Sequence, residues 1–171
     1  MLQIATIADT TLLQQVCREA YTQHFGGHWE EGGLDIYLEA EFNTKRVQED
    51  ITNPNKTYFF IKYEGETVGF IKIDVNASHE SFPNENCCEL EKIYILPGHA
   101  GKGVGKKALG ELLSFCREKD MNAIFLYVID TNESAFHYYQ KMGFQQDGTG
   151  RLEAPLFKEE LRGMFRMSLT L

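Results

Sequence analysis

IYILPGHAGKGVG, residues 93–105, joins an apolar strand directly to a glycine-rich turn. The next stretch, Lys106 to Lys119, carries Leu109, Leu112, Leu113 and Cys116 near helical spacing, so we predict an amphipathic helix. A turn of this kind at the start of a helix directs free backbone N–H groups and the positive end of the helix dipole toward one spot. The sequence therefore predicts a site for an anion such as a diphosphate, formed with little help from side chains.

Two familiar phosphate-binding patterns do not fit these residues. A Walker loop aligned on Gly105 and Lys106 would have Ala100 where its first glycine belongs and Lys107 where a magnesium-binding hydroxyl belongs. A dinucleotide fingerprint begun at Gly101 would need a glycine at Lys106. We therefore set aside a nucleoside triphosphatase and a dinucleotide-binding enzyme.

A second segment, NESAFHYYQKMGF at residues 132–144, follows an apolar strand that we predict over Ala123 to Ile129. Asn132 is a typical N-cap residue, and the apolar positions that follow it fall on one helical face. Gly143 is the expected end of this helix, before a new strand that begins at Phe144.

Together the two segments resemble the GCN5-related N-acetyltransferase superfamily. The glycine loop matches the family motif of Arg or Gln, two free residues, Gly, one free residue and then Gly or Ala, except that Ala100 replaces the leading Arg or Gln. The second segment matches the family pattern NxxAxxxYxxxGF at every defined position. Three pieces, Glu41 to Thr44, Leu90 to Ile95 and Phe136 to Phe144, are also similar to the bacterial spermidine/spermine N-acetyltransferase subgroup.

The expected fold class is α/β, with a mixed, mostly antiparallel central sheet and flanking helices. The resemblance implies the acyl-CoA N-acyltransferase fold, in which two parallel central strands splay apart, and a single domain over residues 1–171. The remaining predicted elements are a strand at Leu2–Ile7, helices at Thr10–Thr22 (capped by Asp9), Leu34–Phe42 and Thr44–Asn53, a hairpin of Thr57–Tyr63 and Thr67–Asn76, and strands at Glu89–Ile95 and Gly163–Leu171.

The resemblance also implies that acetyl-CoA is the cosubstrate and that its pantetheine arm lies between the splayed strands. There the arm would pair with strand backbone as an added strand would. Asn132 would lie near the arm, and Lys141 would reach the adenosine phosphate. The backbone of the strand and the loop would supply the other contacts, from Ile93, Tyr94 and Ile95 to the arm and from Gly101, Lys102, Gly103, Val104, Gly105 and Lys106 to the diphosphate.

Direct attack of an amine on a thioester requires a base, a site that stabilises an oxyanion, and an acid for the leaving thiolate. By resemblance Tyr139 is the acid, although it could instead be a packed aromatic beside Tyr138. Glu89 and Glu91 share one strand face, and Ile93 continues their row if no bulge intervenes. These carboxylates could relay a proton, attract a cation, or simply pair with a lysine.

The segment from residue 29 to residue 42 alternates acidic and aromatic side chains, and in this superfamily it forms one wall of the acceptor site. Carboxylates attract amines, and aromatic faces accept both cations and methylene chains. We therefore expect a polyamine such as spermidine or spermine, although the acidic residues could simply form a solvated helix face. The expected acceptor-binding residues are Trp29, Glu30, Glu31, Tyr37 and Glu41.

Other acceptors stay open: a protein N-terminus, an aminoglycoside or an amino acid. From a different class, a non-catalytic module that binds acyl-CoA would use the same loop. Thiol release from acetyl-CoA in the presence of an amine separates the classes, because a pure binder shows affinity without turnover.

Composition narrows the partners further. The formal charge of −8 argues against nucleic acid, no apolar run is long enough for a membrane span, and the N-terminus lacks the features of a secretion signal, so we expect a cytoplasmic protein. We expect Cys17, Cys87, Cys88 and Cys116 to be buried free thiols. No metal-ligand pattern follows His24 and His28, so no metal is expected. The last strand makes a homodimer possible.

Overall fold

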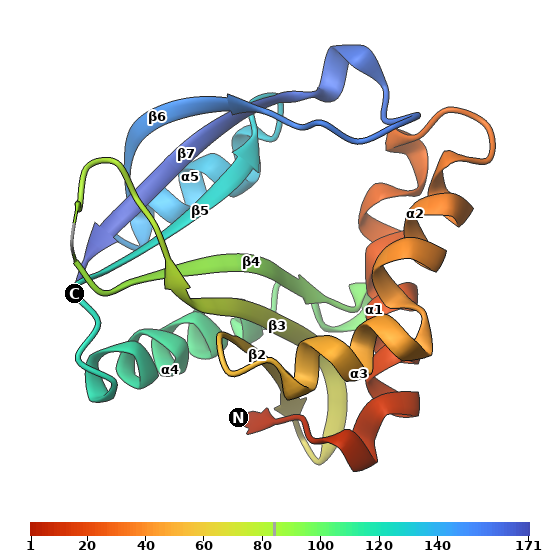
Figure 1. The fold of residues 1–171 in the computed structure, drawn as a ribbon, viewed down its shortest axis with the longest axis horizontal. Helices are drawn as coiled ribbons and strands as arrows, with labels where there is room; N and C mark the ends of the chain where they lie inside the picture. Colours follow the sequence, from red (N-terminus) through yellow and green to blue (C-terminus); the bar gives the residue numbers. More distant parts are fainter. Residues whose placement is uncertain (84) are drawn as a thin grey trace.

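The computed structural model describes residues 1–83 and 85–171, which form a seven-stranded sheet in the order β1-β2-β3-β4-β5-β7-β6 (Figure 1). The strands are β1 (Leu2–Ile4), β2 (Lys56–Tyr63), β3 (Glu66–Ala77), β4 (Cys87–Ile95), β5 (Ala123–Ile129), β6 (Gln145–Arg151) and β7 (Gly163–Thr170). The α-helices are α1 (Thr10–Phe25), α2 (Gly33–Phe42), α3 (Thr44–Thr52), α4 (Val104–Glu118) and α5 (Glu133–Lys141). Short 3-10 turns occupy Ile7–Asp9, Gly26–His28, Pro97–His99 and Glu159–Leu161.

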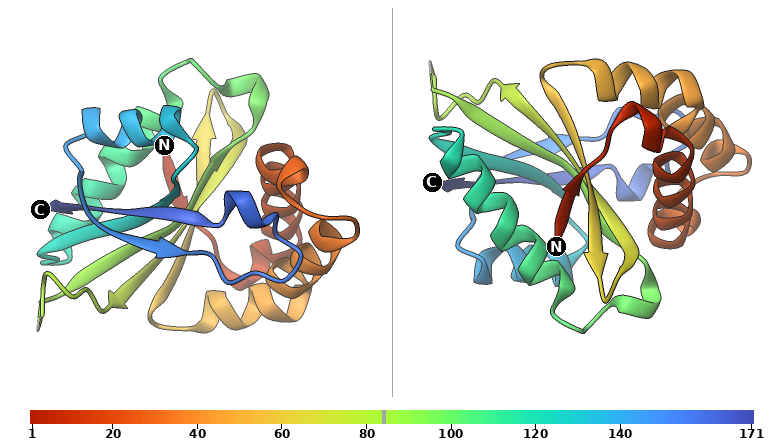
Figure 2. Two further views of the ribbon diagram at one scale, coloured as in Figure 1. Left: turned by 90° about the horizontal axis from the view of Figure 1, so that it is seen from above. Right: turned by 90° about the horizontal axis from the view of Figure 1, so that it is seen from below.

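Helices cover both faces of this sheet (Figure 2). One apolar cluster joins α4 and α5 to the sheet, and we call this side the α4–α5 face. A second cluster joins α1, α2 and α3 to strands β2, β3 and β4 on the opposite side, which we call the α1–α3 face. Alternation along the strands divides the core in this way: in β2, Phe59 and Ile61 belong to the first cluster, whereas Tyr58 and Phe60 belong to the second.

Strands β4 and β5 form the parallel pair of an otherwise antiparallel sheet, and they stay paired only from Cys87 to Glu89 on β4, opposite Ala123 to Phe125 on β5. Beyond these residues the two strands diverge, which Figure 1 shows as an opening angle between β4 and β5. We call the region between their unpaired C-terminal halves the β4–β5 gap. The predicted fold class, with its splayed parallel strands, is confirmed.

A β-bulge interrupts β4 at Glu91. Lys72 of β3 pairs with Lys92, but the next residue, Ile73, pairs with Leu90, so Glu91 is the extra residue. Leu90 and Ile93 therefore both pack toward the α4–α5 face. The row of Glu89 and Glu91 does not continue to Ile93, because the bulge reverses the alternation.

Several element ends differ from the predictions for local reasons. The first strand stops at Ile4, because Thr6 donates its N–H to the carboxylate of Asp9 at 2.8 Å and starts a 3-10 turn. Asp9 precedes α1 as predicted, yet its side chain makes no capping bond to that helix, which runs three residues further than expected, to Phe25. Helix α4 begins at Val104, two residues early, because Gly103 is its N-cap.

All four cysteines are buried and free, as predicted. In the part of the chain that is described, no helix is both long and apolar enough to cross a bilayer.

Candidate active site

The glycine loop between β4 and α4 presents a cluster of backbone donors. Gly101 and Gly103 both have φ of 75°, in the left-handed region that glycine adopts without steric cost. The first intrahelical bond of α4 runs from Lys107 N to Gly103 O at 3.1 Å, and within residues 1–83 and 85–171 no amide from Gly101 to Lys106 donates to a protein acceptor. These amides are therefore available to a ligand, with the exposed side chains of Lys102 and Lys106 beside them.

The edge of β4 that borders the gap carries free backbone groups from alternate residues. Leu96 donates its N–H to Val68 O at 2.9 Å, so Leu96 and, by alternation, Tyr94 direct their backbone groups toward β3. Ile93 and Ile95 direct theirs toward the gap. The carbonyl of Ile95 already has one partner, Nε2 of His24 on α1, at 2.9 Å.

Helix α5 borders the gap from the other side. The Asn132 carboxamide accepts a hydrogen bond from Ala135 N at 3.1 Å, which confirms the predicted N-cap. Burial raises the pKa of the partly buried Tyr139 phenol, and the neighbouring Tyr138 adds to the shift. The Tyr139 ring packs against Tyr138 and Phe144, with ring centroids 5.2 Å and 5.6 Å apart. Lys141 lies exposed in the last turn of α5.

Gly105 keeps open the space between the loop, β4 and α5. A Cβ atom at this position would lie 3.2 Å from Cδ1 of Ile95 and 3.7 Å from the hydroxyl oxygen of Tyr138. That hydroxyl is buried and has no hydrogen-bond partner among the described residues. Unpartnered amides, a glycine where a side chain would intrude and an unpartnered hydroxyl together fit a bound diphosphate and the arm attached to it.

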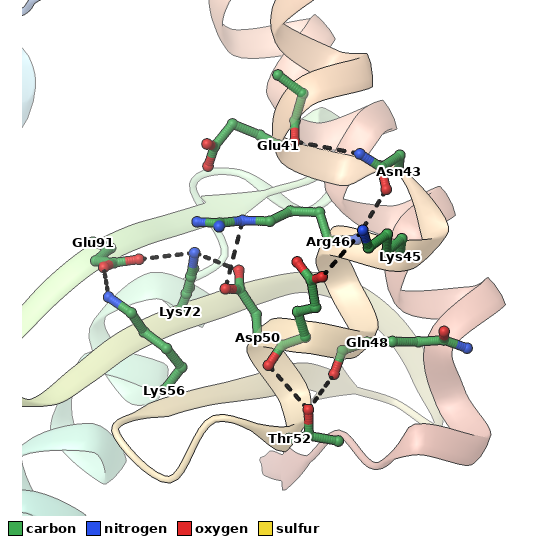
Figure 3. A network of polar contacts seen from close by, with 12 residues as sticks. Glu41, Asn43, Lys45, Arg46, Gln48, Asp50, Thr52, Lys56, Lys72 and Glu91 are labelled. Atoms are coloured by element: carbon green, nitrogen blue, oxygen red, sulfur yellow. Dashed lines mark hydrogen bonds and ion pairs between the residues drawn. The ribbon is translucent and has the colours of Figure 1, made fainter.

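A network of charges occupies the α1–α3 face behind the bulge (Figure 3). Glu91 lies between two lysines: Lys72, whose Nζ is 3.0 Å from Glu91 Oε2, and Lys56, which contacts Oε1. Lys72 is only 2% exposed and also pairs with Asp50 at 2.7 Å, while Lys56 pairs with Asp74 at 2.7 Å. Glu91, on the same strand face as Glu89, thus belongs to an ion-pair network that the protein itself completes.

The environments of Glu89 and Glu91 shift their pKa values in opposite directions. Burial raises the pKa of Glu89, and the negative charge of Glu91 raises it further. Burial alone would also raise the pKa of Glu91, but the ammonium groups of Lys72 and Lys56 outweigh burial and hold it below its ordinary value. Glu89 makes no ion pair with any described residue, so it is the carboxylate with a free proton-accepting capacity at the point where β4 and β5 part.

The predicted acceptor residues lie in three different settings. Trp29 is buried against Phe157, with ring centroids 5.0 Å apart, and Tyr37 stacks on Tyr21 at 4.4 Å. Glu41 of α2 pairs with Lys92 of β4, at 3.5 Å. Glu30 and Glu31 are exposed and, within the described chain, form no ion pair. The two aromatic side chains therefore pack in or against the core. Of the three acidic side chains, Glu41 is paired with a lysine of β4, and Glu30 and Glu31 lie at the surface.

The cations of this face were not predicted from the sequence. Lys72 could have been noticed, because it interrupts the apolar run Phe70-Ile71-Lys72-Ile73 and a buried ammonium needs a partner. Lys92 could not have been noticed in the sequence, because the direction of its side chain depends on the bulge. The remaining members of the network are Asp50, Lys56, Asp74 and Arg46, whose Nε is 3.6 Å from Asp50 Oδ1. Among the residues described, no group of three or more potential ligands could hold a metal ion.

Similarity to known proteins agrees with the family resemblance of the sequence. A model of the Acetyltransferase (GNAT) family matches residues 12–144. The uncharacterised N-acetyltransferase YjgM of Escherichia coli is 28% identical over 82% of this chain and 78% of its own length. A spermidine N(1)-acetyltransferase of Thermoplasma acidophilum is 24% identical over 84% of this chain and 87% of its own.

The crystal structure of the PaiA N-acetyltransferase of Thermoplasma acidophilum in complex with coenzyme A superposes with a TM-score of 0.77. The alignment covers 100% of this chain and 99% of that one at 21% identity, so it supports the fold.

Proposed function

The chain belongs to the acetyltransferase (GNAT) family of acetyl-CoA-dependent N-acetyltransferases, and we propose that it transfers the acetyl group directly to a primary amine of a polyamine such as spermidine or spermine. The observation that carries the proposal is the run of amides from Gly101 to Lys106 that donate to no described residue, beside two parting strands. We further propose that residues 1–171 act as one catalytic domain.

Acetyl-CoA supplies an activated thioester, and the chain positions it. The diphosphate accepts hydrogen bonds from the loop amides at the positive end of α4, where Lys102 and Lys106 neutralise its charge. The pantetheine arm runs along the free backbone groups of Ile93 and Ile95, and its amide competes with His24 for the Ile95 carbonyl. Lys141 is within the same helix as Tyr139 and is assigned to the adenosine phosphate.

We assign the general base to Glu89 rather than Glu91. An attacking amine must lose a proton, and a carboxylate accepts it best when its pKa is raised toward the working pH. Burial raises the pKa of Glu89, whereas Lys56 and Lys72 lower that of Glu91. Among the described residues Glu89 also has no ammonium partner, so it is free to face the ammonium of a substrate.

Tyr139 is assigned the role of the acid that protonates the leaving thiolate. Burial raises the pKa of its phenol, so the proton stays on oxygen at neutral pH until the thiolate forms. Tyr139 packs against the same apolar cluster as Ile93 and Ile95 of β4, which supports a position beside the gap where the thioester end of the cofactor would lie.

The polyamine assignment is supported by acidic side chains without ion-pair partners among the described residues and by the similarity to a spermidine N(1)-acetyltransferase. A polyamine carries several ammonium groups separated by methylenes. Glu89 faces the reacting end, and the exposed Glu30 and Glu31, which have no partners in the described chain, are available to a distant ammonium.

The test is a panel of amines mixed with the purified chain and acetyl-CoA, with release of the CoA thiol as the readout. We expect spermidine and spermine to give higher kcat/KM than a peptide with a free N-terminus or an aminoglycoside. A faster reaction with either of the latter would reassign the acceptor. Saturable CoA binding without turnover on any amine would leave only a binding module.

A further inference from the structure

Tyr138, the neighbour of Tyr139 on α5, carries a polar group that the folded chain does not use. Its ring packs with the apolar cluster of the α4–α5 face, 5.2 Å from the ring of Tyr139. Its hydroxyl is buried and has no hydrogen-bond partner among the described residues. A buried hydroxyl without a partner reduces stability, so a phenylalanine would serve the packing better.

The position of this hydroxyl indicates what it faces. It lies 3.7 Å from the point where a Cβ of Gly105 would be, and Gly105 is in the first turn of α4. The backbone N–H groups of Val104, Gly105 and Lys106 in that turn donate to no acceptor among the described residues. A ligand oxygen with several lone pairs would satisfy the amides and the phenol together, and phosphate oxygens have this property.

We propose that Tyr138 is a cofactor-binding residue whose hydroxyl donates a hydrogen bond to the diphosphate of coenzyme A. The proposal rests on the proposed acetyl-CoA site. The two adjacent tyrosines then serve different ends of one ligand: Tyr138 contacts the diphosphate beside Gly105, and Tyr139 is the residue proposed above to protonate the thiolate at the other end.

The test uses Tyr138→Phe, with calorimetric CoA titration and the melting temperature of the CoA-free protein as separate readouts. We expect the Kd for CoA to rise about tenfold, the loss typical of one hydrogen bond to a charged group. We expect the melting temperature without CoA to stay the same or rise, because the variant removes an unpartnered hydroxyl. A structural role for the hydroxyl would instead lower the melting temperature, and that result would overturn the proposal.

Tyr58→Phe is the matched control. The buried Tyr58 hydroxyl donates to Asp50 Oδ2 at 3.2 Å on the opposite face of the sheet. Its loss should lower the melting temperature of the CoA-free protein and leave the Kd for CoA unchanged, the reverse of the pattern expected for Tyr138→Phe.

Acetyl-pantetheine, which has no diphosphate, locates the contact. Tyr138→Phe should leave the KM for acetyl-pantetheine equal to that of the wild type, and an equal loss with both thioesters would move the contact to the arm and overturn the proposal. Wild-type protein that binds no CoA would refute the proposed function and this inference together. Wild type that binds CoA while Tyr138→Phe binds it equally well would refute the inference alone.

Discussion

The two faces of the sheet treat their polar groups in opposite ways. Around the glycine loop, the amides from Gly101 to Lys106 and the hydroxyl of Tyr138 have no partner in the described chain. On the α1–α3 face, Lys72 and Glu91 belong to a network whose charges are paired within the protein (Figure 3).

This difference explains why the cosubstrate is easier to identify than the acceptor. A cluster of backbone donors without acceptors among the described residues indicates the chemistry of its ligand, because only a group with several acceptor atoms can bind several amides at once. A network of paired charges indicates mainly how the fold is stabilised, and it says little about a ligand. Glu89 is the exception on its face, because it borders the gap and has no ion-pair partner in the described chain.

The largest expected effect is that of Tyr139→Phe, which tests whether the α4–α5 face, where the proposed cofactor site lies, also supplies a catalytic residue. Loss of a general acid should lower kcat by about 10²-fold or more, while the Kd for CoA changes little. Steady-state kinetics and calorimetry on the same preparation check this. Parallel losses in kcat and CoA affinity would reduce Tyr139 to a packing residue.

Lys72→Met tests whether the buried charges on the α1–α3 face are stabilised by ion pairs within the protein. Removing this buried ammonium leaves Asp50 and Glu91 short of a partner, and we expect the free energy of unfolding to fall by about 3 kcal/mol in urea denaturation. The control is Lys45→Met on α3, whose side chain is 86% exposed and pairs with Glu49 at 3.7 Å. The control should cost less than about 0.5 kcal/mol, and equal costs for the two variants would contradict the network.

A smaller effect should separate the two strand carboxylates by pH. The folded-state pKa of Glu91 is lowered, so its stabilising contribution is present above the unfolded pKa and is lost as pH falls through the folded one. The pKa of Glu89 is raised, so its ionised form destabilises the fold once pH exceeds the folded pKa. At pH 8, Glu91→Gln should therefore lower the melting temperature and Glu89→Gln should raise it.

Each shift should amount to a few degrees, as about 1 kcal/mol produces in a chain of this length, and both should vanish at strongly acidic pH. Shifts of the same sign at pH 8 would show that the two carboxylates share one environment. The kcat/KM profile adds a second readout, because only Glu89→Gln should remove its acidic limb.

Sequence patterns predicted the fold and the loop because both depend on local rules. Alternation and helical spacing located the strands and helices, and Asn132 gave the start of α5. Glu89 and Glu91 share one face as predicted, but the direction of Lys92 depends on a bulge, and nothing in the sequence around Glu91 marks one. Trp29 looked like a ligand-facing aromatic, but its ring fills the core against Phe157, a contact between distant parts of the chain that no local pattern contains.

A crystal structure of the chain with coenzyme A bound tests the central claim most directly. We predict diphosphate oxygens within about 3.2 Å of at least two backbone nitrogens between Gly101 and Lys106, with the arm between β4 and β5. A complex in which the diphosphate lies away from this loop, while β4 and β5 hold no arm, would contradict it.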